Sequence, residues 1–201
     1  MADGATALAH GVLEPLEGAA ILGTMKSRPV EYVPTMDVFE FLADPRAFVD
    51  SVLADPVTTS PGGLPPDTVA RLRSPEYGEV YRERYPNAAN VKRRLPALYD
   101  NLRRLHAAGV PIALGTDMWA FPGLAVSVEM GLYVKAGLTP LEAIRAGTLG
   151  SARSLGIDAD YGTLERGKRA DLLVLDADPL AEVKNVRRIA AVYKRGERVG
   201  P

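Results

Sequence analysis

The chain has 201 residues, of which 47% are hydrophobic and 24% are charged, and its formal net charge is −1. This balance gives no reason to expect a nucleic-acid partner, and the absence of cysteine excludes disulfides, thiolate metal sites and cysteine nucleophiles. No apolar run reaches the length of a membrane span and no secretory signal opens the sequence, so we expect a cytoplasmic protein without a membrane partner.

The first ninety residues predict short elements. Residues 14–27 have the apolar spacing of a short helix, and residues 30–35 indicate a strand that Pro34 stops. Residues 36–90 are rich in proline and hold short amphipathic pieces. They predict an excursion of short helices, of the kind that often forms a lid or a substrate wall.

The next seventy residues indicate an α/β arrangement. An amphipathic helix is expected over 91–108, with Gly109 as its C-cap. The continuous apolar run at 110–115 is typical of a strand buried on both faces of a parallel sheet. A helix is expected over 124–136, and the Thr-Pro-Leu-Glu sequence at 139–142 starts another. This helix–strand–helix order predicts an α/β fold.

The character of the sequence changes near residue 160. From Gly162 onward it reads as short strands separated by glycine and aspartate, without long helices. We therefore predict two domains, 1–160 and 161–201.

Two polar side chains follow predicted strands and are candidates for chemistry. Asp117 comes two residues after the strand at 110–115, and catalytic groups of βα folds lie at the carboxyl ends of strands. The alternative is that Asp117 caps a turn. His10 follows a short apolar run and precedes a glycine, which also indicates a strand end, although a structural histidine is the alternative. A histidine and an aspartate from two strand ends are acceptable partial ligands for a Zn²⁺-type ion.

Other reaction classes find no support in the sequence. His106 lies at the end of an amphipathic helix, where it complements the helix dipole. The sequence contains no GxSxG elbow, no Walker-type phosphate loop and no GxGxxG after a strand. Metal-assisted hydrolysis is the reaction class to which the remaining residues point.

Six stretches in a fixed order carry a family resemblance. They are AHGVLEP, VEYVPT, AGVPIALGTD, VKAGLTPLEAIRAGTLGSARSLG, GTLERGKRADLLVLDADPL and VYKRGERV. Together they resemble the C-terminal half of the amidohydrolase superfamily, in its imidazolonepropionase-like and prolidase-like branch. The resemblance covers most of the chain, and the excursion at 36–90 is poorly matched.

The resemblance implies a (β/α)8 barrel with a mono- or binuclear metal centre, together with a small β-sandwich. It implies that Asp117 is a metal ligand and proton shuttle and that His10 is a metal ligand. The ion is expected to be Zn²⁺, with Mn or Fe as alternatives. Trp119 and Phe121 would lie on the loop after the eighth strand, either as an apolar substrate wall or as packing residues. Glu129 is expected to be a structural or supporting residue.

The departures from the family pattern also carry information. The HxH pair of the first strand, the carboxylated lysine of the fourth and the histidine of the fifth find no match here. A barrel alone needs about 250 residues. We therefore expect a fragment that holds strands 7 and 8, the end of strand 6 and the C-terminal strands of the sandwich, and that is inactive in isolation.

Two functional hypotheses follow. In the first, the chain is part of a hydrolase that cleaves C–N bonds of small-molecule amides, cyclic amides or dipeptides by metal-activated water. In the second, it is a non-catalytic truncated or split chain that needs a complementary N-terminal half, or that forms a homo-oligomer.

Overall fold

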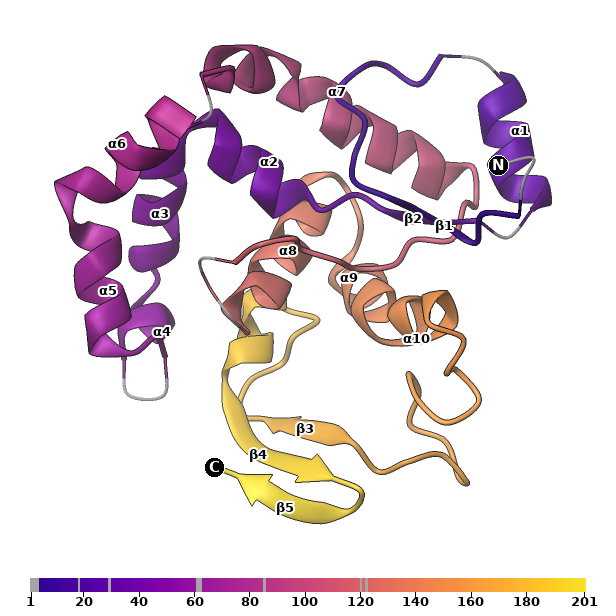
Figure 1. The fold of residues 1–201 in the computed structure, drawn as a ribbon. Coiled ribbons are helices and arrows are strands. Elements are labelled where there is room, and N and C mark those ends of the chain that lie inside the picture. The colour runs from indigo at the N-terminus through magenta and orange to yellow at the C-terminus, as the bar shows by residue number, and fades with distance from the viewer. Residues whose placement is uncertain are drawn as a thin grey trace.

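The computed structural model describes residues 4–17, 19–28, 30–60, 63–84, 86–119, 121 and 123–201. In this part of the chain a parallel strand pair, an antiparallel sheet and many helices are combined (Figure 1). The prediction of a mixed α/β fold is confirmed. No helix within the described ranges has both the length and the apolar composition needed to cross a membrane.

The parallel pair consists of β1 (Ala7–Ala9) and β2 (Glu31–Val33), with α1 (Ala19–Ser27) between them in the chain. The predicted helix at 14–27 thus begins only at Ala19, and the predicted strand at 30–35 is shortened to three residues. Pro34 has no N–H to give to a sheet, and Thr35 turns into the left-handed region with φ 48°. These two residues end β2.

The strand predicted at 110–115 is only partly formed. A single parallel bridge joins Ile112 to Tyr32, whose N–H donates to the Pro111 carbonyl at 2.9 Å. On the other side the Leu114 N–H donates to the Ala146 carbonyl at 3.1 Å, so a helical segment takes the place of a neighbouring strand. The prediction of a full strand is therefore wrong, although the segment runs parallel to β2 as the third member of a row.

The excursion at 36–90 forms short helices, as predicted. They are α2 (Met36–Ala43), α3 (Pro45–Leu53), α4 (Pro56–Thr59), α5 (Pro66–Arg73) and α6 (Pro75–Arg84). The carboxylates of Asp44 and Asp55 accept from the first-turn amides of α3 and α4 and so start these helices. Helices α3 to α6 form a separate lobe at the side of the molecule (Figure 1).

The long helices end as the sequence predicts. Helices α7 (Ala88–Ala107) and α8 (Leu124–Lys135) are followed by Gly109 and Gly137, whose φ angles are 79° and 111°. The next residue in each case, Val110 or Leu138, donates back to a carbonyl of the last helical turn. Glycine is needed at both places because the backbone turns left-handed there.

Helix α9 (Pro140–Arg145) starts with the predicted cap. Thr139 and Glu142 form a reciprocal capping box, with the Glu142 N–H donating to Thr139 Oγ1 and the Thr139 N–H to the Glu142 carboxylate. The helix continues through a π-helical turn, η1 (Ala146–Gly150), into α10 (Ser151–Ser154). No pattern in the sequence predicted the π-helical turn.

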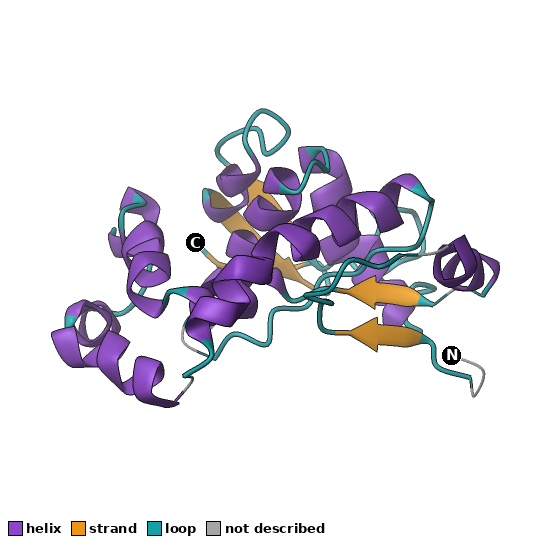
Figure 2. Cartoon of the chain, turned by 90° about the horizontal axis from the view of Figure 1, so that it is seen from above, coloured by secondary structure: helices purple, strands orange, loops and turns teal. Residues whose placement is uncertain are grey.

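The main core lies between the parallel segments and helices α7 to α9. Tyr32, Leu98, Leu102, Leu105 and Tyr133 are fully buried there. The two parallel strands lie side by side, separate from the antiparallel sheet (Figure 2). A second core cluster, rich in aromatic side chains, joins the helical lobe to α2, to the loop after Asp117 and to α8. The parallel segments are thus held by helices whose apolar faces were visible in the sequence.

The antiparallel sheet contains β3 (Leu172–Leu175), β4 (Ile189–Lys194) and β5 (Glu197–Gly200), in that order, and η2 (Val183–Arg187) precedes β4. Asp171 Oδ1 accepts from the Arg195 N–H at 2.7 Å and fixes the β4–β5 turn. Leu173 and Val174 are successive residues of β3 and are 52% and 44% exposed. Because successive side chains of a strand point to opposite faces, both faces of β3 carry exposed apolar groups.

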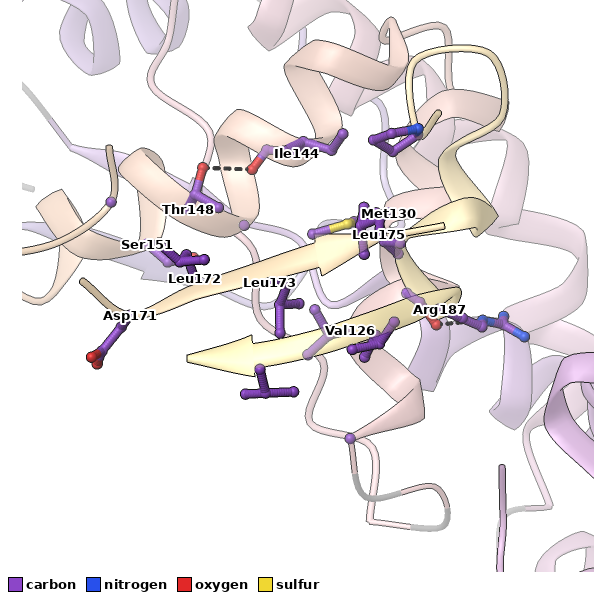
Figure 3. Close-up of a pocket in the computed structure, with 18 of the residues that line it drawn as sticks. Val126, Met130, Ile144, Thr148, Ser151, Asp171, Leu172, Leu173, Leu175 and Arg187 are labelled. Carbon is purple, nitrogen blue, oxygen red and sulfur yellow. Dashed lines mark hydrogen bonds between the residues drawn. The ribbon is translucent and has the colours of Figure 1, made fainter. Parts of the chain in front are cut away.

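An apolar cavity of about 1000 Å³ separates this sheet from the helices. Val126 and Met130 of α8, Ile144 of α9, and Leu173 and Leu175 of β3 line it (Figure 3). Neither His10 nor Asp117 is among its lining residues. The candidate chemistry therefore lies elsewhere.

Candidate active site at the ends of the parallel segments

Each of the parallel segments is followed by a residue in the left-handed backbone region. These residues are His10 after β1, Thr35 after β2 and Asp117 after the segment at 110–114, with φ angles of 70°, 48° and 52°. Such angles are uncommon for residues other than glycine and are frequent at functional sites. Since the carboxyl ends of parallel strands meet at one edge, the fold brings the two predicted site residues, His10 and Asp117, to the same edge.

His10 is exposed and tied to the neighbouring strand. Its N–H donates to the Val33 carbonyl at 2.9 Å, and its Nδ1 lies 3.1 Å from Thr35 Oγ1. When Nδ1 carries the ring proton and donates it to Thr35, the Nε2 lone pair remains available for a ligand. The structural-histidine alternative fits less well, because the ring is not enclosed by the core.

Asp117 is exposed and does not cap the turn. The Met118 N–H donates to Thr116 Oγ1 at 3.3 Å, so the threonine takes the capping place. Helix α8 begins after Gly123 without a side-chain cap. Within the described ranges no hydrogen bond to the Asp117 carboxylate is found, so its oxygens stay available to a cation or to water.

A buried pair of carboxyl groups, Asp37 and Glu129, lies behind this edge. Both residues are fully buried. Glu129 Oε1 accepts from the Met36 N–H at 2.7 Å, and Oε2 accepts from the Asp37 N–H at 2.8 Å. Asp37 Oδ1 accepts from the Val38 N–H at 2.9 Å. Glu129 of α8 thus binds both amides that begin α2.

Burial raises the proton affinity of both carboxyl groups. Burial raises the pKa of Asp37 to about 7, and the nearby negative charge of Asp117 adds to this effect. Burial, followed by the charge of Asp37, raises the pKa of Glu129 well above its usual range. Burial therefore favours the protonated form of Glu129 at neutral pH and that of Asp37 below about pH 7.

The two aromatic residues of the loop after Asp117 differ in exposure. Trp119 is 47% exposed, and its indole N–H donates to the Tyr81 hydroxyl of α6 at 3.1 Å. Phe121 is fully buried, with its ring centroid 6.1 Å from that of Phe48 in α3. Of the two alternatives for Phe121, this burial favours packing over a substrate wall.

The remaining histidine lies in a different place. His106 Nε2 is 3.0 Å from the Glu142 carboxylate, so it joins the end of α7 to the start of α9. The sequence predicted only that His106 complements the dipole of α7, and the structure adds this contact with Glu142. His106 is not part of the edge that holds His10.

Sequence reasoning missed Thr35 and Asp37 as members of the site. The stretches VPTMD and LGTD share a pattern that could have indicated them. In each stretch a threonine follows an apolar segment, and an aspartate comes one or two positions later. Glu129 was expected to be a supporting residue, and its contacts with α2 agree with that role.

His10 and Asp117 have the atom types that bind a divalent ion, but they are fewer than the ligands such an ion needs. Imidazole nitrogen and carboxylate oxygen are both ligands that Zn²⁺ accepts. Among the residues that the structure describes, however, no group of three or more His, Asp or Glu side chains could hold a metal ion. Catalytic zinc sites use three protein ligands. His10 and Asp117 therefore make up part of such a site.

Curated relatives match parts of the chain. Ochratoxinase from Aspergillus niger is 39% identical over 95 residues, which are 45% of this chain and 19% of the relative. Imidazolonepropionase from Desulfotalea psychrophila is 38% identical over 120 residues, which are 52% of this chain and 28% of the relative. The matched parts thus cover less than a third of the length of these relatives.

Solved structures match almost the whole chain. The A. niger ochratoxinase structure superimposes on 97% of this chain and 37% of its own, with a TM-score of 0.65 and 26% identity. A Xaa-Pro dipeptidase with bound methionine in its active site gives a TM-score of 0.66 at 24% identity, over 97% of this chain and 40% of its own, a likeness in fold alone.

The family model described as "Amidohydrolase family" matches residues 68–199, which include Asp117, Glu129 and the antiparallel sheet. This match extends over more than half of the sequence. The chain belongs to the amidohydrolase family.

Proposed function

We propose that this chain supplies the His10–Asp117 side of a metal-dependent site that hydrolyses C–N bonds of small-molecule amides, cyclic amides or dipeptides. The relatives named imidazolonepropionase and ochratoxinase are hydrolases of C–N bonds, and they match 52% and 45% of this chain. The observation that carries the proposal is the position of His10 and Asp117 at the ends of parallel segments, each with donor atoms available.

In this mechanism His10 Nε2 and the Asp117 carboxylate would hold the ion, with Zn²⁺ first and Mn or Fe as alternatives. A divalent ion supplies a nucleophile at neutral pH by lowering the pKa of bound water from 15.7 to about 7. Asp117 accepts the proton of the attacking water and returns it to the leaving nitrogen, so that the amine departs neutral. The exposed indole of Trp119 offers an apolar surface to the substrate beside this carboxylate.

The second candidate function is that of a partner in a larger site. It is supported by the incomplete ligand set among the described residues and by the apolar side chains that β3 exposes on both faces. We propose that the parallel segments are part of a (β/α)8 barrel and that residues 161–201 are one layer of a composite β-sandwich. The remaining ligands would then come from a complementary chain or from a second copy.

Metal content after dialysis tests the proposal directly. We expect the purified chain to retain Zn, Mn or Fe, and we expect Asp117→Asn to lower the affinity by more than the 10–100-fold typical of outer-shell partners. Asp67→Asn, at an exposed position of α5, is the matched control and should retain the ion. A chain that retains no metal, alone or with a complementary half, would contradict the proposal.

A further inference from the structure

We propose that Glu129 is a positioning residue that fixes the orientation and tautomer of His10 through the start of helix α2. This inference rests on the proposed function, since it concerns the imidazole that would hold the ion. The path runs from the Glu129 carboxylate to the first amides of α2, and from Thr35 to His10 Nδ1. It involves no residue of the large cavity.

The first step is the unusual cap of helix α2. The first amides of a helix have no partner within the helix, and a threonine at the N-cap normally accepts from one of them. Thr35 is the N-cap of α2, yet its hydroxyl makes no such bond. Glu129, which lies 93 residues beyond Met36 in the chain, accepts from the amides of Met36 and Asp37 instead.

The second step is the release of the Thr35 hydroxyl. Because Glu129 satisfies the amides, the threonine side chain is free to face the other way, where its Oγ1 lies 3.1 Å from His10 Nδ1. Thr35 is a buried β-branched residue with φ 48°, a conformation that persists only where the surroundings enforce it. The bonds to Glu129 on one side and the ladder bond from His10 to Val33 on the other provide that enforcement.

The third step is the effect on the imidazole. A partner at Nδ1 fixes which ring nitrogen carries the proton and how the ring is turned. With the proton on Nδ1, Nε2 is presented as a lone pair. Histidine ligands of metal sites depend on such a bond, whose loss typically lowers metal affinity 10–100-fold.

A purely structural role for Glu129 makes a different prediction. If Glu129 only joins α8 to α2, its replacement lowers stability without changing the His10 ring. The two roles can be separated by nitrogen-15 NMR of the imidazoles in the metal-free protein at pH 8. The chain has only two histidines, so His106 serves as an internal reference.

Glu129→Gln is the main variant because it keeps the shape of the side chain. One of its two terminal atoms becomes an NH2 group that cannot accept from a backbone amide. We expect the His10 Nδ1 and Nε2 shifts to move toward averaged tautomer values, and the affinity for Zn²⁺ to fall about 10–100-fold. Thr35→Val removes only the hydroxyl and should produce the same changes at His10.

Glu142→Gln is the matched control. Glu142 is also a helix-capping glutamate, but it contacts His106. Its replacement should shift the His106 nitrogens and leave both the His10 pattern and the Zn²⁺ affinity unchanged. An unchanged His10 pattern in Glu129→Gln would overturn the proposal.

Two further readouts keep the outcome decisive. If Glu129→Gln does not fold, the His10 nitrogen shifts of Thr35→Val test the bond to the ring, and hydrogen exchange of the wild-type protein tests the cap. The Met36 and Asp37 amides should then be protected, whereas the first-turn Asp67 amide of the uncapped helix α5 should exchange rapidly. Rapid exchange of all of these amides overturns the inference. If the wild-type chain binds no Zn²⁺, the proposed function fails, and the metal-free NMR pattern still decides the role of Glu129.

Discussion

Two clusters of charged side chains that lie largely away from solvent differ in how the cost of burying their charges is offset. The Arg187 guanidinium meets the opposite charge of Asp55, with its Nη1 3.1 Å from Asp55 Oδ2. The pair Asp37 and Glu129 brings two acids together, and protonation reduces the cost of burying them. Clusters of the first kind join parts of a structure, whereas buried like charges are frequent at functional sites.

The partners of Arg187 show the joining role. Its Nε donates to Ser127 Oγ at 2.7 Å and its Nη1 to Thr58 Oγ1 at 3.2 Å, so one side chain of η2 holds α8 and α4. Burial lowers the pKa of Arg187, and the charge of Asp55 opposes this shift. The guanidinium remains charged, because arginine is not deprotonated in proteins. This cluster is therefore independent of pH in the neutral range.

The Asp37–Glu129 and Arg187–Asp55 clusters should differ most in how their contribution to the free energy of unfolding depends on pH. The pKa of Asp37 is raised from its ordinary 3.8 to about 7. Between these values the folded state holds a proton that the unfolded state has released. The stability that Asp37 contributes is thus fully present at low pH and is lost as the pH rises through this window, by at most about 1.4 kcal/mol per pH unit, and Glu129 adds a slope of the same sign.

Asp37→Asn should reduce this slope, because asparagine has no proton to release, and the part that Glu129 contributes should remain. Urea unfolding of the wild type and of the variant at several values between pH 4 and pH 7 measures it. Asp50→Asn, at an exposed position of α3, should keep the wild-type slope. Parallel curves for the wild type and Asp37→Asn would show that Asp37 holds no extra proton in the folded state.

Removal of the guanidinium should cause the next largest effect. Arg187→Leu leaves Asp55 without its ion-pair partner in a mostly buried place, and we expect a loss of about 2–3 kcal/mol in the free energy of unfolding. The loss should be nearly equal at pH 5 and pH 8. Lys184→Ala breaks the exposed pair with Glu182 and should change stability by less than about 1 kcal/mol. A similar loss in both variants would refute the joining role.

Removal of the exposed cap of α9 should change the free energy of unfolding least. Its contribution to stability should also depend on pH in the opposite direction to that of Asp37. The Thr139 hydroxyl and N–H bind Glu142 and hold its pKa below the usual 4.5. This contribution is present above that value and is lost as the pH falls. Thr139→Ala should cost about 1 kcal/mol near pH 7 and less near pH 3, as thermal unfolding at the two values would show. A larger cost at the lower pH would contradict this assignment.

The sequence predicts what local rules decide. Gly109 and Gly137 could be predicted as helix ends because the left-handed backbone turn there depends only on neighbouring residues. Thr139 could be predicted as a helix start because its capping partner, Glu142, is three residues away. The strand at 110–115 was overestimated because its outer partner is a helical carbonyl, that of Ala146, and no local pattern announces it.

The site shows the same division. His10 and Asp117 could be proposed from their positions after apolar runs, and the structure places both at the ends of parallel segments. The contact of Glu129 with Asp37 spans 92 residues, and no spacing rule predicts a pair at that distance. The raised pKa values of Asp37 and Glu129 depend on burial, which a single sequence does not report.

The Arg187 contacts also have a consequence for the order of events during synthesis. Arg187 follows Asp55 by 132 residues. At about 5–20 residues per second, the ribosome needs about 7–26 seconds to add them. The aromatic cluster of the lobe is complete once Phe121 and Ala125 have been made, so the lobe packs on α8 before Arg187 adds the ionic tie.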